Sequence, residues 1–177
     1  MNWGFENEAA VKGPYAQRAN RQRLQMLVNS TGYNLVLGTD ESPSQANGFS
    51  DSTGLEFRTA RIWSVFPYDA VSIMIRSMEM FHIVVTPTCG LHFHFSGVTL
   101  TDDQFNRISE ALLKTHYWHT RKKWITDRSG ETKYAPLRKI CDGHYEARVF
   151  NASNKFHGIY QPWLFLKKLI VNETGAR

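Results

Sequence analysis

Two histidines stand two residues apart in an apolar stretch, GLHFHFSG, at residues 90–97. Successive side chains of a β-strand point to opposite faces of the sheet, so His92 and His94 share one face and the apolar residues share the other. This pattern calls for a sheet with a core on one face and imidazoles on the other. Taken alone, the pair fits hydrogen-bonded histidines on a half-buried strand as well as a metal or catalytic site.

The same spacing of charged residues recurs in three other predicted strands. The pairs are Glu6 with Glu8, Glu56 with Arg58, and Glu146 with Arg148. A carboxylate on the inner face of a sheet is costly unless it is paired or bound to a metal. Carboxylates with imidazole suit Mg²⁺ or Mn²⁺, and neighbouring arginines suit phosphate oxygens. The four pairs together predict metal-assisted phosphoryl transfer, and the alternative is that all four face solvent as cross-strand ion pairs.

The arrangement of predicted elements indicates an α+β fold in a single domain, residues 1–177. Strands are predicted at residues 2–10, 33–38, 54–63, 82–87, 90–97 and 144–150. Helices are predicted at residues 15–29, 67–81, from Thr101 onward with a Thr101/Gln104 capping box, and at 161–171 with Pro162 in the first turn. Residues 39–54, rich in Ser and Gly, are predicted as a loop. Because several strands have one polar face, the sheet is expected to be mostly antiparallel.

Composition favours a soluble globular protein. The chain has 177 residues, of which 42% are hydrophobic, and this suffices for a sizeable core. It has no apolar run of membrane-spanning length and no signal-peptide pattern at its start, so we expect a cytoplasmic protein without membrane contact. In such a compartment Cys89 and Cys141 are expected to be free thiols.

The net charge of +5 is concentrated in one part of the chain. The basic residues there are Lys114, Arg121, Lys122, Lys123, Arg128, Lys133, Arg138 and Lys139. Such a segment favours an anionic partner, and a nucleotide triphosphate, an acidic substrate and nucleic acid all fit. A solvated basic surface with no partner is the remaining alternative.

The motifs on these strands resemble those of the amidoligase family, which belongs to the carboxylate–amine ligase superfamily with glutamine synthetase and glutamate–cysteine ligase. The most distinctive is Cys-Gly-Leu-His-x-His, present at residues 89–94. The others are a Gly-hydrophobe-Glu-x-Glu strand at 4–8, an Asp-x-Ser turn at 40–42, a Glu-containing strand at 54–59 and a Glu-x-Arg strand at 146–151 followed by a helix. The resemblance thus spans nearly the whole chain.

The resemblance implies a curved, mostly antiparallel sheet that forms a funnel-like active site with helices packed outside. ATP would bind there with two or three divalent ions, Mg²⁺ or Mn²⁺. The implied metal ligands are Glu6, Glu8, Glu56 and Glu146, with His92 or His94, and Asp40 and Asp51 are candidates for a further acidic ligand near Glu56. Arg148 and Arg58 would hold the phosphates, and Arg121 and Lys133 are candidates for binding ATP or the acyl phosphate.

The implied reaction is ATP-dependent amide formation. A substrate carboxylate attacks the γ-phosphate of ATP to make an acyl phosphate, and an amine then displaces phosphate. The acid and the amine would be small molecules or peptides. Tyr134 resembles part of an aromatic–proline segment of the family. Because the chain is compact for the family, an oligomer or a partner protein could supply further substrate-binding elements.

Two other functions compete with this prediction. Nucleic-acid binding is suggested by the cluster at residues 121–124 and by Tyr117 and Trp118, which could stack on bases. A zinc hydrolase built on His92 and His94 would need a third ligand. The candidates for that ligand are His82, His116 and His119. A relative that keeps the fold without catalysis is a further alternative.

Overall fold

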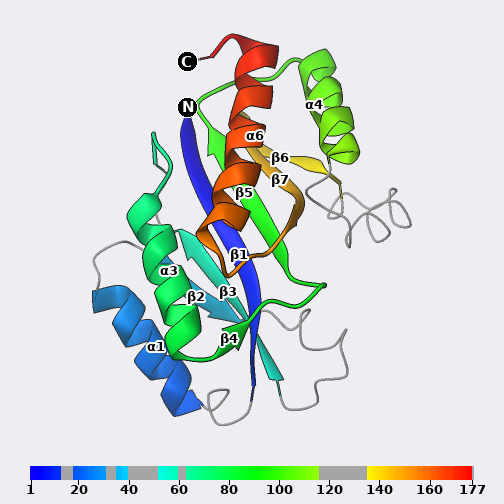
Figure 1. The fold of residues 1–177 in the computed structure, drawn as a ribbon. Helices are drawn as coiled ribbons and strands as arrows, with labels where there is room; N and C mark the ends of the chain where they lie inside the picture. Colours follow the sequence, from blue (N-terminus) through cyan, green and yellow to red (C-terminus); the bar gives the residue numbers. More distant parts are fainter. Residues whose placement is uncertain (13–17, 31–34, 40–51, 60–62, 116–134, 177) are drawn as a thin grey trace.

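An antiparallel sheet of seven strands organises the part of the chain that the computed structural model describes, residues 1–12, 18–30, 35–39, 52–59, 63–115 and 135–176 (Figure 1). The strands are β1 (Asn2–Lys12), β2 (Leu35–Thr39), β3 (Ser52–Thr59), β4 (Ile83–Val84), β5 (Gly90–Ser96), β6 (Leu137–Cys141) and β7 (His144–Asn151). Their order across the sheet is β2-β3-β1-β5-β7-β6, and β4 pairs with the end of β1. The long β1 therefore lies between β3 and β5 near the centre of the sheet.

The described helices pack on one face of this sheet. They are α1 (Arg18–Ser30), α3 (Tyr68–Met80), α4 (Asp102–Lys114) and α6 (Phe156–Thr174). In Figure 1, α6 lies across β1 and β5, with α3 and α1 below it. The rings of Trp163 in α6 and Trp3 in β1 are 5.7 Å apart, and those of Phe105 in α4 and Tyr145 in β7 are 6.2 Å apart. The opposite face of the sheet carries the charged pairs.

The core between the sheet and the helices is built from alternate strand residues. Phe5, Phe57, Phe93 and Phe95 are almost fully buried. Burying a phenylalanine side chain contributes roughly 1.5–3 kcal/mol. A slip of one residue would move each ring to the other face of the sheet, so these rings hold the strands in register.

The α+β class, the antiparallel sheet and the helix after Thr101 are confirmed. At the start of α4 the Thr101 hydroxyl accepts a hydrogen bond from the Gln104 backbone N–H at 3.3 Å. The Gln104 side-chain oxygen accepts one from the Thr101 N–H at 2.9 Å. This reciprocal pair is the capping box that the sequence predicts.

The predicted start of the last helix is wrong. Helix α6 begins at Phe156, five residues before the predicted Gln161, so Pro162 lies inside the helix and not in its first turn. Proline lacks the N–H that would bond to the carbonyl four residues earlier, here Gly158. Phe156, Ile159 and Trp163 recur with helical spacing and all pack against the core, which offsets that missing bond.

Two strand predictions also differ from the structure. The strand predicted over residues 82–87 has only two paired residues, Ile83 and Val84, and His82 before them has a positive φ of 50°. No strand is predicted at residues 137–141, where the pattern of basic residues dominates, and the structure has β6 there. The loop predicted at residues 39–54 overlaps both neighbouring strands, since Thr39 ends β2 and residues 52–54 begin β3, and residues 40–51 lie outside the described part of the chain.

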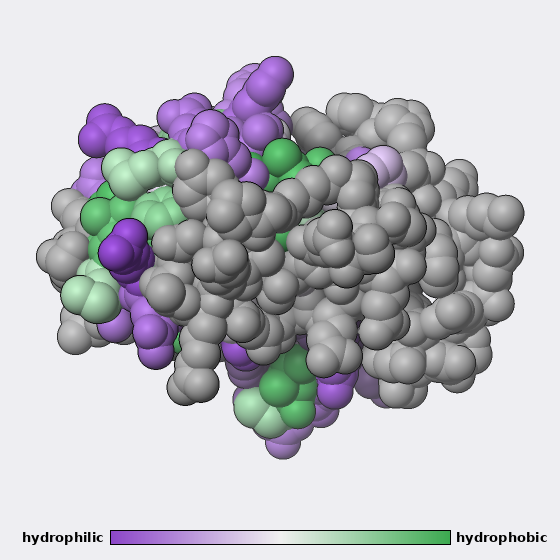
Figure 2. Space-filling model, turned by 90° about the horizontal axis from the view of Figure 1, so that it is seen from below, coloured by the Kyte–Doolittle hydropathy of each residue, from purple (hydrophilic) through white to green (hydrophobic). Residues whose placement is uncertain are grey.

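Some hydrophobic side chains remain at the surface of the described part, among them Met26, Val65 and Met80. Figure 2 shows hydrophobic residues beside hydrophilic ones on the side seen from below. Single exposed apolar residues are normal in globular proteins. Among the described helices, none is long and apolar enough to cross a membrane.

One buried polar residue ties the central strand to the start of α6. Asn7 lies on the core face of β1, between Glu6 and Glu8, and is fully buried. Its amide nitrogen donates to the Ser153 carbonyl at 3.2 Å, and its amide oxygen accepts from the Ser153 N–H at 3.1 Å. The segment that joins β7 to α6 is thereby fixed to β1.

Replacing Asn7 should therefore destabilise the protein. We expect Asn7→Ala to lower the free energy of unfolding by about 1–3 kcal/mol, because it leaves the part-buried N–H and carbonyl of Ser153 without these partners. Urea unfolding would measure the change, with Asn106→Ala on the exposed side of α4 as the matched control. Equal unfolding midpoints for the two variants would contradict this role of Asn7.

Candidate metal centre

The predicted pairs meet on the face of the sheet opposite to the helices. The pairing of β1 with its two neighbours places Glu6 between Arg58 of β3 and His92 of β5. The pairing of β5 with β7 places Glu146 opposite His94. Side chains directly opposite each other on one face are close enough to interact. Strands from both ends of the chain thus contribute to one cluster.

The cluster contains two groups of potential metal ligands that share one residue. The first group is Glu6, Glu56 and His92, and the second is Glu6, His94 and Glu146. In each group one ligand atom from every residue lies within 4.8 Å of the others. Because Glu6 has two carboxylate oxygens, it can contribute to both groups at once.

The distances within these groups fit shared coordination. The Nδ1 atom of His92 is 3.3 Å from Glu6 Oε2, and the Nε2 atom of His94 is 3.4 Å from Glu6 Oε1 and 4.0 Å from Glu146 Oε1. Two ligand atoms that each lie about 2.1 Å from one ion are about 3.0 to 4.2 Å apart, depending on the angle between them. His94 Nε2 is also buried and makes no hydrogen bond to any described residue. The donor set and its spacing therefore fit one or two divalent ions.

Glu8 lies beside the two groups and belongs to neither of them. One of its carboxylate oxygens accepts a hydrogen bond from the Gly90 N–H at 2.6 Å, and the other lies 3.4 Å from His92 Nε2. A carboxylate that contacts the second nitrogen of a ligating histidine typically fixes the orientation of its ring. The geometry thus gives Glu8, which the sequence predicts as a ligand, a supporting position behind His92.

Burial excludes the alternative in which all four pairs face solvent. The side chains of His92, Glu8 and Glu146 are only 2%, 6% and 5% exposed. Glu8 also lies directly opposite Glu56 in the register. Two like charges that face each other destabilise a sheet unless a positive charge lies near them. The face therefore holds concentrated negative charge that a cation would stabilise.

Three arginines lie at the more exposed rim of this cluster. Arg58 is 3.2 Å from Glu56, Arg148 is 3.5 Å from Glu146, and Arg138 is 3.9 Å from Glu146. Their side chains are 46%, 24% and 45% exposed, so the guanidinium groups can reach a ligand that the buried carboxylates cannot.

Two backbone features make room for these side chains. A Cβ atom at Gly38, which pairs with Glu56, would lie 2.6 Å from the Arg58 guanidinium, so the glycine leaves space for it. The register between β5 and β7 shifts at His92, where two residues of β7, Arg148 and Val149, face one residue of β5. Such bulges re-aim side chains and are common beside functional sites.

The charge state of the Glu6 carboxyl suits a group that binds a cation. Burial alone would raise the pKa of the Glu6 carboxyl, but the neighbouring imidazoles of His92 and His94 outweigh burial and hold that pKa well below its ordinary value. Glu6 is therefore ionised at neutral pH. Burial, together with the nearby His94, lowers the pKa of His144.

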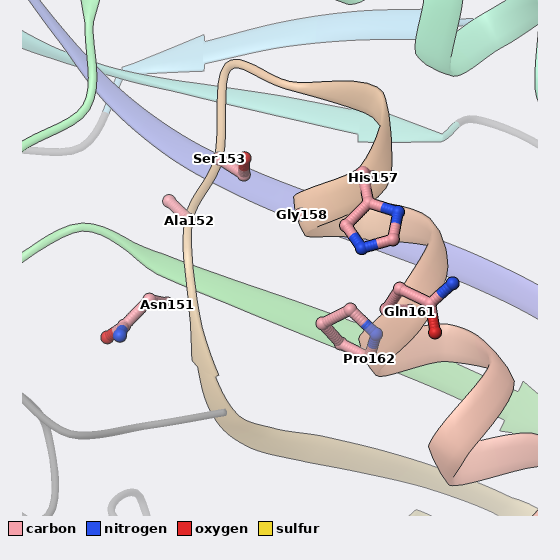
Figure 3. A pocket seen from close by; sticks show the side chains of 7 residues that line it. All are labelled: Asn151, Ala152, Ser153, His157, Gly158, Gln161 and Pro162. Carbon is pink, nitrogen blue, oxygen red and sulfur yellow. The ribbon is translucent and has the colours of Figure 1, made fainter. Parts of the chain in front are cut away.

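A separate cavity of about 540 Å³ lies where β7 passes into α6. Figure 3 shows its lining residues, which come from the end of β7, the connection to α6 and the first two turns of that helix. They are Asn151, Ala152, Ser153, His157, Gly158, Gln161 and Pro162. None of the metal-ligand candidates lines it, and the lining contains no carboxylate, lysine or arginine.

Several residues predicted for the site lie outside the described part of the chain. They are Arg121, Lys133, Asp40, Asp51, Tyr134, His116 and His119. His82 is described, but it is exposed at the end of α3 and belongs to neither ligand group.

The sequence reasoning missed two residues of the cluster, Arg138 and His144. A signal for each was present. His144 continues the period-two pattern of Glu146 and Arg148. Asp-Gly at residues 142–143 is a typical two-residue hairpin turn and predicts a strand before it that contains Arg138. Counting outward from the turn pairs Lys139 with Glu146, and the irregularity between Lys139 and Cys141 shifts the pairing so that Arg138 lies opposite Glu146.

Comparisons of the chain with protein-family models, curated proteins and solved structures found no match.

The shared position of Glu6 predicts how ion binding should respond to substitution. We expect the protein to bind two Mn²⁺ ions, and Glu6→Gln should weaken both because it removes the carboxylate common to the two groups. Glu56→Gln and Glu146→Gln should each weaken the binding of only one ion. Titration calorimetry would measure the stoichiometry, with the exposed Glu110→Gln as the matched control. Loss of a single ion in Glu6→Gln would contradict the inference that both ligand groups use Glu6.

Proposed function

We propose that this protein is an ATP- and divalent-metal-dependent ligase that joins a carboxylate to an amine through an acyl phosphate. The observation that supports this most strongly is the pair of ligand groups that share Glu6, with arginines at their rim. Sites that bind two metal ions with flanking guanidinium groups suit phosphoryl transfer. The strand motifs of the sequence, above all Cys-Gly-Leu-His-x-His at residues 89–94, also support membership of the amidoligase family.

Each part of the cluster has a role in this proposal. Glu6, Glu56 and His92 would hold one Mg²⁺ or Mn²⁺, and Glu6, His94 and Glu146 the other. When bound, the two ions would neutralise charge on the phosphate oxygens of ATP. Glu8 would keep the His92 ring oriented through its contact with Nε2.

The arginines would bind the triphosphate and the transferred phosphoryl group. Arg148 and Arg58 have partly exposed guanidinium groups beside buried carboxylates, so they are anchored at one side and open at the other. Arg138 has the same arrangement and joins them in this role. Arg121 and Lys133 remain candidates for contacts with ATP or the acyl phosphate.

The proposed reaction has two balanced steps. An oxygen of the substrate carboxylate bonds to the γ-phosphorus, the bond to the bridging oxygen breaks, and ADP leaves. The amine then attacks the acyl carbon, inorganic phosphate leaves, and the amine gives up a proton. In the first step Arg148 and Arg58 would stabilise charge on the phosphoryl oxygens and help to hold the reacting oxygens in line. A sheet curved into a funnel would shield this chemistry from water.

A metal-dependent hydrolase is a second candidate, because each ligand group mixes imidazole with carboxylate, and zinc accepts both. Zinc that binds tightly in the purified protein, without any ATP binding, would favour it. Nucleic-acid binding has less support, since it does not explain the buried carboxylates of Glu8 and Glu146.

Metal-dependent nucleotide binding tests the proposal. We expect a non-hydrolysable ATP analogue to bind in titration calorimetry with Mg²⁺ or Mn²⁺ and not with EDTA. Glu146→Ala should abolish that binding, because it removes a ligand of the second group. Arg148→Ala should weaken it by about 10-fold or more, since a hydrogen bond to a charged group is worth about 1.5–3 kcal/mol.

Arg107→Ala is the matched control for the arginine. Arg107 is exposed on α4 and pairs with Glu173 at 2.7 Å, away from the metal centre, so its loss should leave nucleotide affinity unchanged. Wild-type protein that binds ions but no ATP analogue under any of these conditions would overturn the ligase proposal.

A further inference from the structure

A third imidazole contacts the second ligand group from behind. His144 precedes Glu146 by two residues on β7, so both side chains are on the same face of the strand. Its Nε2 atom is 3.2 Å from the Nδ1 atom of His94, and the two ring centroids are 5.4 Å apart. The contact is made by the His94 nitrogen that does not face Glu6.

This contact bears on where His94 carries its proton. A neutral imidazole has one N–H donor and one acceptor nitrogen. If His94 donates from Nδ1 to His144, then Nε2 has a free lone pair directed at the carboxylates of Glu6 and Glu146. If His144 donates instead, the proton of His94 is on Nε2, which lies 3.4 Å from Glu6 Oε1 and 4.0 Å from Glu146 Oε1. A histidine nitrogen binds a metal ion only through its lone pair, so a bound ion selects the first arrangement.

We propose that His144 is a positioning residue that accepts the Nδ1 proton of His94 and thereby presents His94 Nε2 to the second metal ion. This inference rests on the metal centre of the proposed function and does not depend on ATP or on the reaction. Residues that hold the second nitrogen of a ligating histidine typically account for a 10–100-fold difference in metal affinity.

The two ligand groups then differ in how their histidines are held. His92 in the first group contacts a buried carboxylate, Glu8, at 3.4 Å. His94 in the second group contacts the imidazole of His144. Substitution of His144 should therefore act on one ion and leave the other unchanged, and this selectivity distinguishes positioning from a general loss of stability.

Three substitutions at residue 144 separate the acceptor from the size of the side chain. His144→Gln places a carbonyl oxygen close to where Nε2 lies, so it keeps an acceptor for His94. His144→Asn is polar but one methylene shorter and does not reach that place. His144→Leu removes the acceptor altogether. Thermal unfolding of the metal-free variants would check that each is folded.

Titration with Co²⁺, monitored by calorimetry and by the visible absorption of the bound ion, tests the inference. We expect wild type and His144→Gln to bind two ions with similar affinities. His144→Leu and His144→Asn should bind the second ion about 10–100-fold more weakly and the first ion normally. The absorption that develops with the second ion should change in these two variants only.

The outcomes are distinguishable from failure of the proposed function. Equal affinity for the second ion in wild type and His144→Leu, or a loss in His144→Gln as large as in His144→Leu, would overturn the positioning role. Wild type that binds fewer than two ions would overturn the two-ion centre and this inference with it. Two ions in wild type without binding of an ATP analogue would overturn the ligase proposal and leave the role of His144 standing.

Discussion

The register of β1 against β3 and β5 is the constraint on which the rest of the structure depends. It places Glu6 beside both Arg58 and His92 on one face, and it places Phe5 and Asn7 against the core on the other. A shift by one residue would bury the carboxylates beneath the helices and expose the phenylalanine. The hydrophobic core therefore determines the geometry of the charged cluster, although the two lie on opposite faces of the sheet.

The energetics of this cluster distinguish a buried binding site from a surface with exposed ion pairs. An exposed cross-strand ion pair contributes about 0.2–1 kcal/mol, whereas removing a carboxylate from water costs several kcal/mol. Glu8 and Glu146 are almost fully buried, so the second figure applies to them. The contacts with His92 and with the rim arginines offset part of that cost. A bound divalent cation would offset more, and this is the physical reason to expect one.

Much of the cluster was predictable because a strand repeats every two residues. That period alone places His92 with His94 and Glu146 with Arg148 on common faces, and the structure confirms both placements. Which strands are neighbours is decided by long-range pairing, which local patterns do not encode, so the sharing of Glu6 and the supporting position of Glu8 could not be predicted. The start of α6 differs from the prediction because proline favours the first turn of a helix, whereas the helical spacing of Phe156, Ile159 and Trp163 places one more turn before Pro162.

The order of the ligands along the chain has a consequence for protein synthesis. The first group uses residues from β1, β3 and β5, and the second group also needs Glu146 from β7. At a synthesis rate of about 5–20 residues per second, more than fifty residues separate the emergence of β5 from that of β7, so several seconds pass between them. In the proposed two-ion centre, the ligands of the first group would thus emerge before those of the second. An ion present at that moment would help to decide which metal such a centre holds.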